Sequence, residues 1–317
     1  MTAAEVPWVP GTEPLHGVLL RESGSPGGAA TLGGLGLQQG PVPIPSGAPL
    51  WRREDRGERY LSINEIHAHD DGHVLRIDCQ GRGAFAISDE QIVVDWQGGT
   101  PYDHYLQTLG LSLWLERRGV PCLHANTLAL DDHSAIGLLA PSRGGKSTLS
   151  AALVAQGMAL MTDDMAALYA SDEPGARVYP ARAQLRLWPD TLAQLSSGPA
   201  AAECPRVHER FGKRLLNLPR SAVRDCRQLS HLFILDRRDD AATCTTIEAV
   251  TPADALIHCL RQSMLADAYE ALGLAGARVA AIARALGGLR VWRLRYATGH
   301  EQTGAVAHAL AQHVHQA

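Results

Sequence analysis

The chain has 317 residues, of which 45% are hydrophobic and 20% are charged, a composition typical of globular proteins. Its formal net charge of −4 argues against a nucleic-acid partner or an anionic membrane surface. No apolar run approaches the roughly 20 residues that cross a bilayer, and residues 1–10 lack the basic start and apolar core of a secretory signal. We therefore expect a cytoplasmic protein.

The six cysteines are scattered, with no Cys-x-x-Cys pair. Disulfide frameworks and structural zinc sites need closer spacing, so we expect reduced thiols. The 14 histidines are also dispersed and form no metal-binding motif.

The first third of the chain divides into two parts. Residues 1–54 are interpreted as a flexible N-terminal segment, because 22–49 is rich in Gly, Pro and Ser. Ordered structure is expected from about Tyr60. Residues 55–118 are predicted to form a small β-rich domain with a helix, because short alternating segments are separated by turn residues. The predicted elements are strands at 60–63, 73–77, 84–87 and 91–94 and a helix at 102–118 that ends at Gly119.

Residues 119–317 are predicted to form an α/β domain, because strand and helix patterns alternate. The predicted strands are 123–130, 134–139, 158–161, 178–187, 232–235 and 289–296; the predicted helices are 148–156, 252–259, 275–286 and a C-terminal one.

A candidate phosphate-binding loop lies between one of these strands and the helix after it. The segment Ala140-Pro141-Ser142-Arg143-Gly144-Gly145-Lys146-Ser147-Thr148 follows the pattern Gly-x-x-x-x-Gly-Lys-Ser/Thr, except that Ala140 replaces the first glycine. Backbone N–H groups and the start of a helix make such a loop an anion site. The Lys146 amine would reach the β- and γ-phosphates of ATP, and the Ser147 hydroxyl would bind Mg²⁺. Alanine fits the first position only if its φ is negative.

Two adjacent acids, Asp163 and Asp164, follow the strand after this helix. In a right-handed βαβ unit the carboxyl ends of both strands meet at one sheet edge, beside the loop. Because successive side chains of an extended segment point in opposite directions, we expect a division of roles. One acid would hold Mg²⁺, and the other would orient or deprotonate an acceptor hydroxyl.

The hairpin around Asp131–His133 places a third group at the loop. Residue numbers across its ladder should sum to about 264, which pairs His124 with Ala140. His124 could then hydrogen-bond a carboxylate or a phosphate oxygen, or serve only a structural role.

These residues resemble the HPr serine kinase/phosphorylase family. The resemblance covers roughly Tyr60 to the C-terminus and is carried by His124-Ala-Asn-Thr-Leu-Ala-Leu, the loop 140–148 and Met161-Thr-Asp-Asp. It is strongest to shorter HPr-kinase-related proteins, some of which belong to lasso-peptide and other modified-peptide clusters. Those relatives also show stretches similar to Val178-Tyr-Pro, Leu185-Arg-Leu-Trp-Pro-Asp and Lys213-Arg-Leu-Leu-Asn-Leu-Pro.

The resemblance implies a P-loop kinase core of the HPr kinase and phosphoenolpyruvate carboxykinase type, with ATP and Mg²⁺ and a Ser or Thr hydroxyl as acceptor. It further implies that Lys146 and Ser147 take the phosphate and Mg²⁺ roles and that Asp164 is the proton acceptor. By the same resemblance, Asp163 supports the metal or the base, and His124 supports the second acid. The bifunctional enzymes of the family are hexamers, so a homo-oligomer stays open here.

Arg143 departs from the family pattern, because a glycine is usual at its position. It requires a different backbone conformation or strain, or its guanidinium itself meets a phosphate. The family's signature for phosphorylase activity is not evident. We therefore expect a kinase without efficient phosphorylase activity, and a substrate other than HPr.

Two further stretches are ambiguous. Lys213 and Arg214 follow 196–209, which is interpreted as mobile, and they either close over the nucleotide or form a solvated basic turn. Leu187–Asp190 is interpreted as a packing corner.

Three functions remain open. The leading one is ATP-dependent phosphorylation of a Ser or Thr hydroxyl on a peptide or protein, such as a ribosomally made precursor peptide. The others are a nucleotide-binding regulatory or scaffold protein with little turnover, and a kinase of a small hydroxyl compound.

Overall fold

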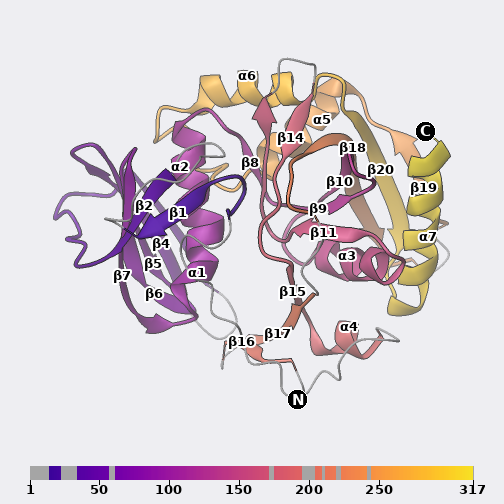
Figure 1. Ribbon diagram of the computed structural model, residues 1–317, viewed down its shortest axis with the longest axis horizontal. Coiled ribbons are helices and arrows are strands. Elements are labelled where there is room, and N and C mark those ends of the chain that lie inside the picture. Colours follow the sequence, from indigo (N-terminus) through magenta and orange to yellow (C-terminus); the bar gives the residue numbers. More distant parts are fainter. Residues whose placement is uncertain are drawn as a thin grey trace.

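The computed structural model describes residues 14–22, 34–56, 61–170, 175–194, 204–208, 211–218, 223–240 and 244–316. The chain forms two units that lie side by side, the N-terminal one in indigo and purple and the C-terminal one from magenta to yellow (Figure 1). Within the described ranges, no helix is both long and apolar enough to cross a membrane.

The N-terminal unit is a seven-stranded sheet that buries one face against a helical segment. Its strand order is β1-β2-β7-β6-β5-β4-β3, antiparallel from β3 to β7 and parallel at β1–β2 and β2–β7. Alternation puts Leu75 and Ile77 of β5 into the same core as Leu111 and Leu115 of the helix. The elements are β1 (Leu19–Glu22), β2 (Gly34–Gln39), β3 (Trp51–Arg56), β4 (Leu61–His69), β5 (Gly72–Asp78), β6 (Gly81–Ile87), β7 (Gln91–Gly99), α1 (Tyr102–Tyr105), a π-helical turn (Leu106–Gly110) and α2 (Leu111–Arg117).

The interpretation of 1–54 as a flexible segment is wrong where the structure describes it. Strand β2 pairs in parallel with β7, β3 pairs with β4, and Leu35 and Leu37 are buried. Glycines at 33, 34 and 36 weaken the strand pattern around these leucines, and the ladder partner β7 lies more than 50 residues away in sequence. Residues 1–13 and 23–33 lie outside the described residues.

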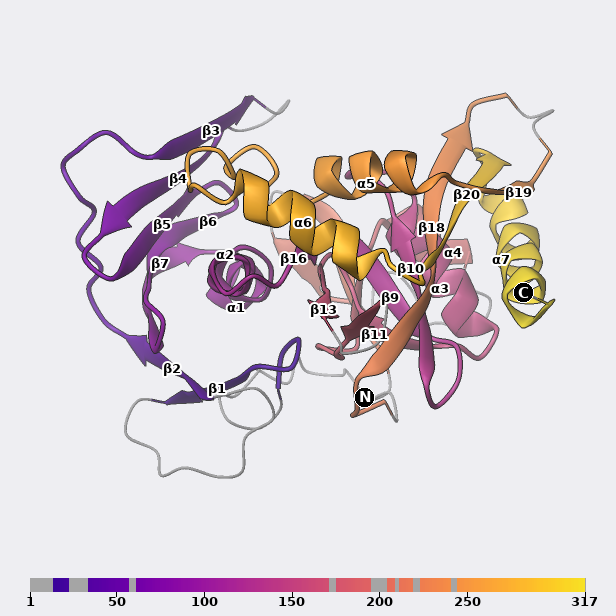
Figure 2. The same cartoon turned by 90° about the horizontal axis from the view of Figure 1, so that it is seen from above.

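The C-terminal unit is a mixed sheet between two pairs of helices, so its architecture is α/β as expected. The strand order is β11-β9-β10-β18-β14-β13, and β20 joins both β18 and β19. Figure 2 shows α5 and α6 on one side, whereas α3 and α7 share a separate core with β10 and β20. The elements are β8 (Cys122–Leu123), β9 (Ala125–Ala129), β10 (Ser134–Leu139), α3 (Lys146–Ala155), β11 (Ala159–Thr162), β12 (Ala166–Ala167), β13 (Tyr169–Ala170), β14 (Ala176–Val178), β15 (Gln184–Leu187), α4 (Pro189–Gln194), β16 (Arg206–His208), β17 (Phe211–Asn217), β18 (Arg227–Arg238), β19 (Thr246–Ala249), α5 (Pro252–Arg261), α6 (Ala275–Ala285), β20 (Arg290–Ala297) and α7 (His300–Gln316).

The hairpin register predicted from the sequence is confirmed. Ala125 pairs with Leu139 and Ala129 with Ala135, so the residue numbers sum to 264. Strand β9 is antiparallel to both β10 and β11, so β10 and β11 run in the same direction with β9 between them. The carboxyl ends of β10 and β11 therefore meet at one edge of the sheet.

The strand structure predicted at 178–187 divides between two strands of different sheets. Strand β14 joins the central sheet, whereas β15 belongs to a separate three-stranded sheet with β17 and β16. Pro180 lies between them, and because proline has no N–H to donate, it interrupts the ladder.

Buried contacts fix the two units against each other. Glu116 of α2 forms an ion pair with Arg278 of α6 and accepts hydrogen bonds from Tyr269 Oη (3.0 Å) and the Cys122 amide (2.6 Å). Asp103 of α1 forms an ion pair with Arg182, just before β15. The start of the helical segment thus lies beside the small sheet that follows the paired acids.

Candidate active site

The predicted phosphate-binding loop joins β10 to α3, and its glycines are needed where they stand. Gly145 has φ = 92°, and a Cβ there would lie 2.8 Å from Tyr296 Oη and 2.9 Å from Arg237 Cδ. A Cβ on Gly144 would lie 2.6 Å from that of Ala140. Cβ atoms rarely lie this close to other heavy atoms, and the positive φ of Gly145 strains any other residue, so both positions favour glycine.

The two departures from the motif have different outcomes. Ala140 is buried and its φ is not positive, which meets the condition set from the sequence. Arg143 has φ = 65°, so the prediction of an unusual backbone conformation there is confirmed. Its carbonyl accepts a hydrogen bond from Arg237 (3.1 Å), which helps hold this left-handed residue. A contact between its exposed guanidinium and a phosphate stays a prediction.

The Lys146 side chain is directed into the loop. Its Nζ donates to the carbonyls of Ala140 (2.7 Å) and Pro141 (3.3 Å) and lies 3.2 Å from His124 Nε2. Only 5% of Lys146 is exposed, and burial lowers its pKa to about 8, although the charges of Asp164 and Asp163 act in the opposite direction. The amine is therefore protonated at neutral pH and loses its charge in mildly alkaline solution.

ATP affinity should consequently depend on pH in one direction. A protonated Lys146 attracts phosphate oxygens, so we expect a constant affinity below about pH 8 and a loss approaching about tenfold per pH unit above it. Calorimetric titrations with ATP between pH 7 and 9.5 measure this. Lys146→Arg is the control, because arginine stays charged over this range. A wild-type affinity that is flat to pH 9.5 contradicts the assignment.

His124 lies at the mouth of the loop, where the hairpin register predicted it. Burial and the charge of Lys146 lower its pKa to about 4, so the imidazole is neutral and Nε2 accepts a hydrogen bond from Lys146. Its distance to Asp164 Oδ1 is 3.9 Å, too long for a hydrogen bond. Support of the second acid by His124 stays a prediction.

Asp163 lies against the first turn of α3. Its Oδ1 accepts from Ser147 Oγ (3.1 Å) and Asn126 Nδ2 (2.8 Å), and its Oδ2 accepts from the Arg186 amide (3.1 Å). The sequence argument therefore correctly brought this acid to the loop. Ser147 and Asp163, the two predicted Mg²⁺ ligands, are in direct contact.

The extended backbone expected through the paired acids is wrong. Strand β11 ends at Thr162, and Asp164 is left-handed, with φ = 68°. The turn brings both carboxylates to the lining of one cavity. The prediction assumed extended backbone through Asp164, where alternation would hold.

The two carboxylates have opposite protonation preferences. Burial and the charge of Asp164 raise the pKa of Asp163 to about 7. Burial also acts to raise the pKa of Asp164, but the positive charges of Lys213 and Arg186 outweigh it and hold that pKa below its usual value. At neutral pH Asp164 is thus ionised and able to accept a proton.

Asn126 was not singled out from the sequence, yet it holds both acids. It is fully buried, donates to Asp163 Oδ1 (2.8 Å) and Ser150 Oγ (2.9 Å), and accepts from the Asp164 amide (3.1 Å). Because Asn126 and Thr127 are successive residues of a strand, the sequence indicates that they lie on opposite faces of the sheet. Only the fold reveals which groups Asn126 contacts.

Replacing Asn126 with alanine should lower the free energy of unfolding by about 2–3 kcal/mol, because buried polar partners lose their hydrogen bonds. Urea denaturation measures the change. Asn217→Ala is the control, since Asn217 is exposed and accepts one hydrogen bond, from Gln184; its expected change is within about 0.5 kcal/mol. Equal free energies of unfolding for the Asn126 variant and wild type would show that Asn126 does not hold the two acids in place.

A small cavity of about 50 Å³ opens over the loop, here called the loop cavity. Its walls include residues 142–148, His124, Asp164, Arg186, Trp188 and Lys213. Arg186 was also missed from the sequence; it alternates with the buried Leu185 and Leu187 on β15, so it takes the opposite face.

Lys213 and Arg214 separate as successive strand residues do. Lys213 lines the loop cavity, with Nζ 5.9 Å from the centre of the Trp188 ring. Arg214 instead donates to the carbonyl of Cys204 (3.1 Å). The interpretation of Leu187–Asp190 as packing alone is thus incomplete, because Trp188 forms part of the cavity wall. Most of 196–209 lies outside the described residues.

The oxygen donors at the loop fit Mg²⁺. This ion takes few protein ligands and shares substrate phosphates, and the Ser147 hydroxyl and Asp163 carboxylate converge within 3.1 Å. No group of three His, Cys, Asp or Glu side chains that could hold a metal occurs in the part of the chain that the structure describes.

Comparisons with known proteins give little beyond this geometry. No family model matches the chain, and no curated protein does. Among solved structures, the chain is similar to the Hpr(Ser) kinase/phosphatase from Coxiella burnetii, with 14% identity over 62% of this chain and 97% of that one. The TM-score is 0.35, so this likeness carries no argument, and a function must be argued from the site.

Proposed function

We propose that this chain is an ATP-dependent kinase that transfers the γ-phosphate to a Ser or Thr hydroxyl of a peptide or protein. The observation that supports it best is the contact of two parts. Ser147, in the first turn of the helix after a glycine-dependent loop, donates to Asp163, which follows β11, a strand parallel to β10 with β9 between them. Phosphoryl transfer needs this set: an anion cradle, a metal ligand and a base.

In the proposed reaction each side chain acts at a stated atom. Lys146 Nζ exchanges the loop carbonyls for β- and γ-phosphate oxygens. Asp164 accepts the proton of the acceptor hydroxyl. The hydroxyl oxygen bonds to the γ-phosphorus while the bond between that phosphorus and the bridging β-phosphate oxygen breaks, leaving ADP. Arg186 and Lys213 line the same cavity and offset the charge of the transferring group. Mg²⁺, held by Ser147 and Asp163, would supply neutralisation of the phosphate oxygens.

Two alternatives from the sequence remain. A nucleotide-binding scaffold with little turnover is favoured by the left-handed Arg143, and a small-molecule kinase differs only in its acceptor.

The test is incubation with ATP labelled at the γ-phosphate, Mg²⁺ and peptides from neighbouring genes, followed by mass spectrometry. Gain of one phosphate on Ser or Thr supports the proposal. ATP binding with no transfer to any peptide or hydroxyl compound favours the scaffold.

A further inference from the structure

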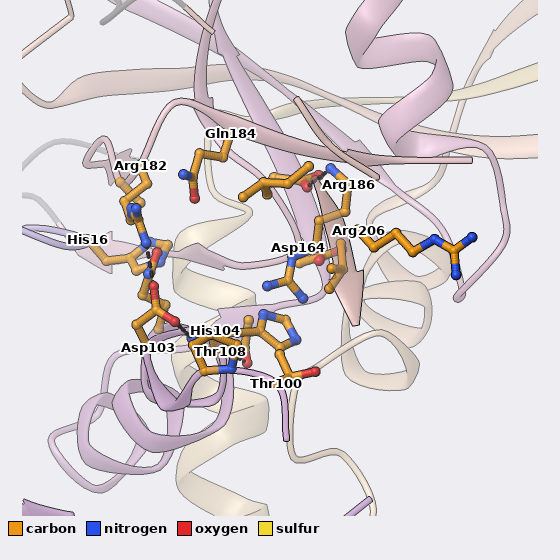
Figure 3. A pocket seen from close by; sticks show the side chains of 16 residues that line it. His16, Thr100, Asp103, His104, Thr108, Asp164, Arg182, Gln184, Arg186 and Arg206 are labelled. Atoms are coloured by element: carbon orange, nitrogen blue, oxygen red, sulfur yellow. Dashed lines mark hydrogen bonds and ion pairs between the residues drawn. The ribbon is translucent and has the colours of Figure 1, made fainter. Parts of the chain in front are cut away.

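A second cavity of about 130 Å³ adjoins the loop cavity at the boundary between the two units. We call it the interface cavity; its walls come from His16, from residues between 100 and 108 at the start of the helical segment, from residues between 181 and 186, from the paired acids, and from β16 and β17 through 206, 207 and 215. Asp164 and Arg186 line both cavities. Figure 3 shows Asp164 and Arg186 facing the side chains of His104, Thr108 and Thr100 across this space.

The interface cavity contains buried polar atoms without partners. Thr100 Oγ1 and His16 Nδ1 belong to residues that are each 2% exposed, and neither atom has a hydrogen-bond partner among the described residues. Buried hydroxyl and ring nitrogen atoms are normally paired. His16 also has φ = 50°, and such strain concentrates at ligand sites. Both residues line the cavity, so an occupant with hydrogen-bonding groups would satisfy them.

The charges that line the cavity largely offset one another, because three acids face three arginines: Asp103, Asp163, Asp164, Arg182, Arg186 and Arg206. Asp103 is paired with Arg182, and Arg186 faces the other two acids at the end nearest the loop. Elsewhere on the wall, burial lowers the pKa of His16 to about 4 and that of His104 well below its usual value, so both rings are neutral. Thr100 and Gln107 add uncharged polar groups. The cavity thus suits an uncharged polar occupant.

The size of the cavity limits the occupant further. At about 130 Å³ it holds only a handful of water-sized groups. It accommodates one side chain or a small molecule, not a folded domain.

We infer that the interface cavity is the acceptor site of the proposed kinase. Its occupant is an alcohol hydroxyl flanked by an uncharged hydrogen-bonding group, such as an amide or a second hydroxyl. This inference rests on the proposed function and adds the route: the acceptor reaches Asp164 from the side of the N-terminal unit, while the terminal phosphates of the nucleotide enter the loop cavity. The helical segment of the N-terminal unit then determines specificity. A serine within a peptide and a free polyol share this chemistry.

The test is binding of small probes to the full chain, measured by ligand-observed NMR. The probes are N-acetyl-L-serine methylamide and glycerol, and N-acetyl-L-alanine methylamide is the blank. Thr100→Val removes the unpaired hydroxyl at constant shape, and Gln107→Met removes an amide of the same wall. Each substitution should lower the affinity for the tighter-binding probe by about three- to tenfold, because one hydrogen bond is lost. Thr303→Val on α7, outside both cavities, should not.

The outcomes separate this inference from the proposed function. Tighter binding of the capped serine identifies a peptide acceptor, and tighter binding of glycerol identifies a free alcohol. The inference is overturned if neither probe binds, if the alanine blank binds equally well, or if Thr100→Val and Gln107→Met leave the affinity unchanged. ATP binding is measured separately by calorimetry. A chain that binds ATP but no probe refutes the acceptor site alone, and one that binds a probe but no ATP refutes the kinase.

Discussion

Replacing Lys146 with alanine should weaken ATP binding by about 100-fold or more. The Nζ atom already donates to two loop carbonyls, so it can donate to two phosphate oxygens in their place. Each charge-assisted hydrogen bond contributes about 1.5–3 kcal/mol, and the loss of two accounts for the expected factor. Calorimetry with ATP and Mg²⁺ measures it on wild type and variant under identical salt, because exposed charges are screened.

Lys213→Ala provides the matched comparison, since Lys213 is the only other lysine of the chain. It lines the same cavity from β17, so its loss removes an equal charge but leaves the hydrogen bonds of Lys146 to the loop carbonyls in place. A smaller loss of ATP affinity in Lys213→Ala than in Lys146→Ala would show that direct contacts of Lys146 with the phosphates account for the binding. Equal losses would reduce the role of Lys146 to its charge. No ATP binding by wild type would mean a degenerate loop, and the kinase would give way to the scaffold.

Much of the C-terminal unit could be predicted from patterns of residues that are close in sequence. The turn at Asp131–His133 determines the hairpin register, and the register in turn placed His124 beside the loop. The apolar strand, the Gly-Lys-Ser triplet and the apolar helix gave the strand–loop–helix turn. Such features depend on residues close in sequence, so periodicity and turn chemistry suffice to predict them.

Other features depend on partners that only the fold supplies. Strand β2 is stabilised by a ladder with β7 rather than by its own glycine-rich residues. The left-handed turn at Asp164 is not encoded by an obvious glycine, and Asn126 gains its role from acids nearly 40 residues away. His16 reaches the interface cavity from the other unit. Tertiary contacts of this kind leave no periodic signal in the sequence.

Replacing Asp164 with asparagine should remove phosphoryl transfer while leaving ATP binding intact. Loss of a general base costs about 10²- to 10⁴-fold in rate. The change is nearly isosteric, and asparagine tolerates the left-handed backbone found there at φ = 68°, so the fold should be retained. Single-turnover transfer to the acceptor measures the rate, and calorimetry measures the affinity for ATP.

Because Asp164 is charged, the substitution should change ATP affinity and transfer rate in different directions. The carboxylate is ionised and lies on the cavity that would hold the phosphates, so its removal lifts a like-charge repulsion. ATP affinity should therefore stay equal or increase as the transfer rate falls. Asp163→Asn should behave differently, because Asp163 accepts from Ser147 and Asn126 and would hold Mg²⁺. Its loss should weaken Mg²⁺-dependent ATP binding as well. Normal turnover by Asp164→Asn would show that the base is another residue.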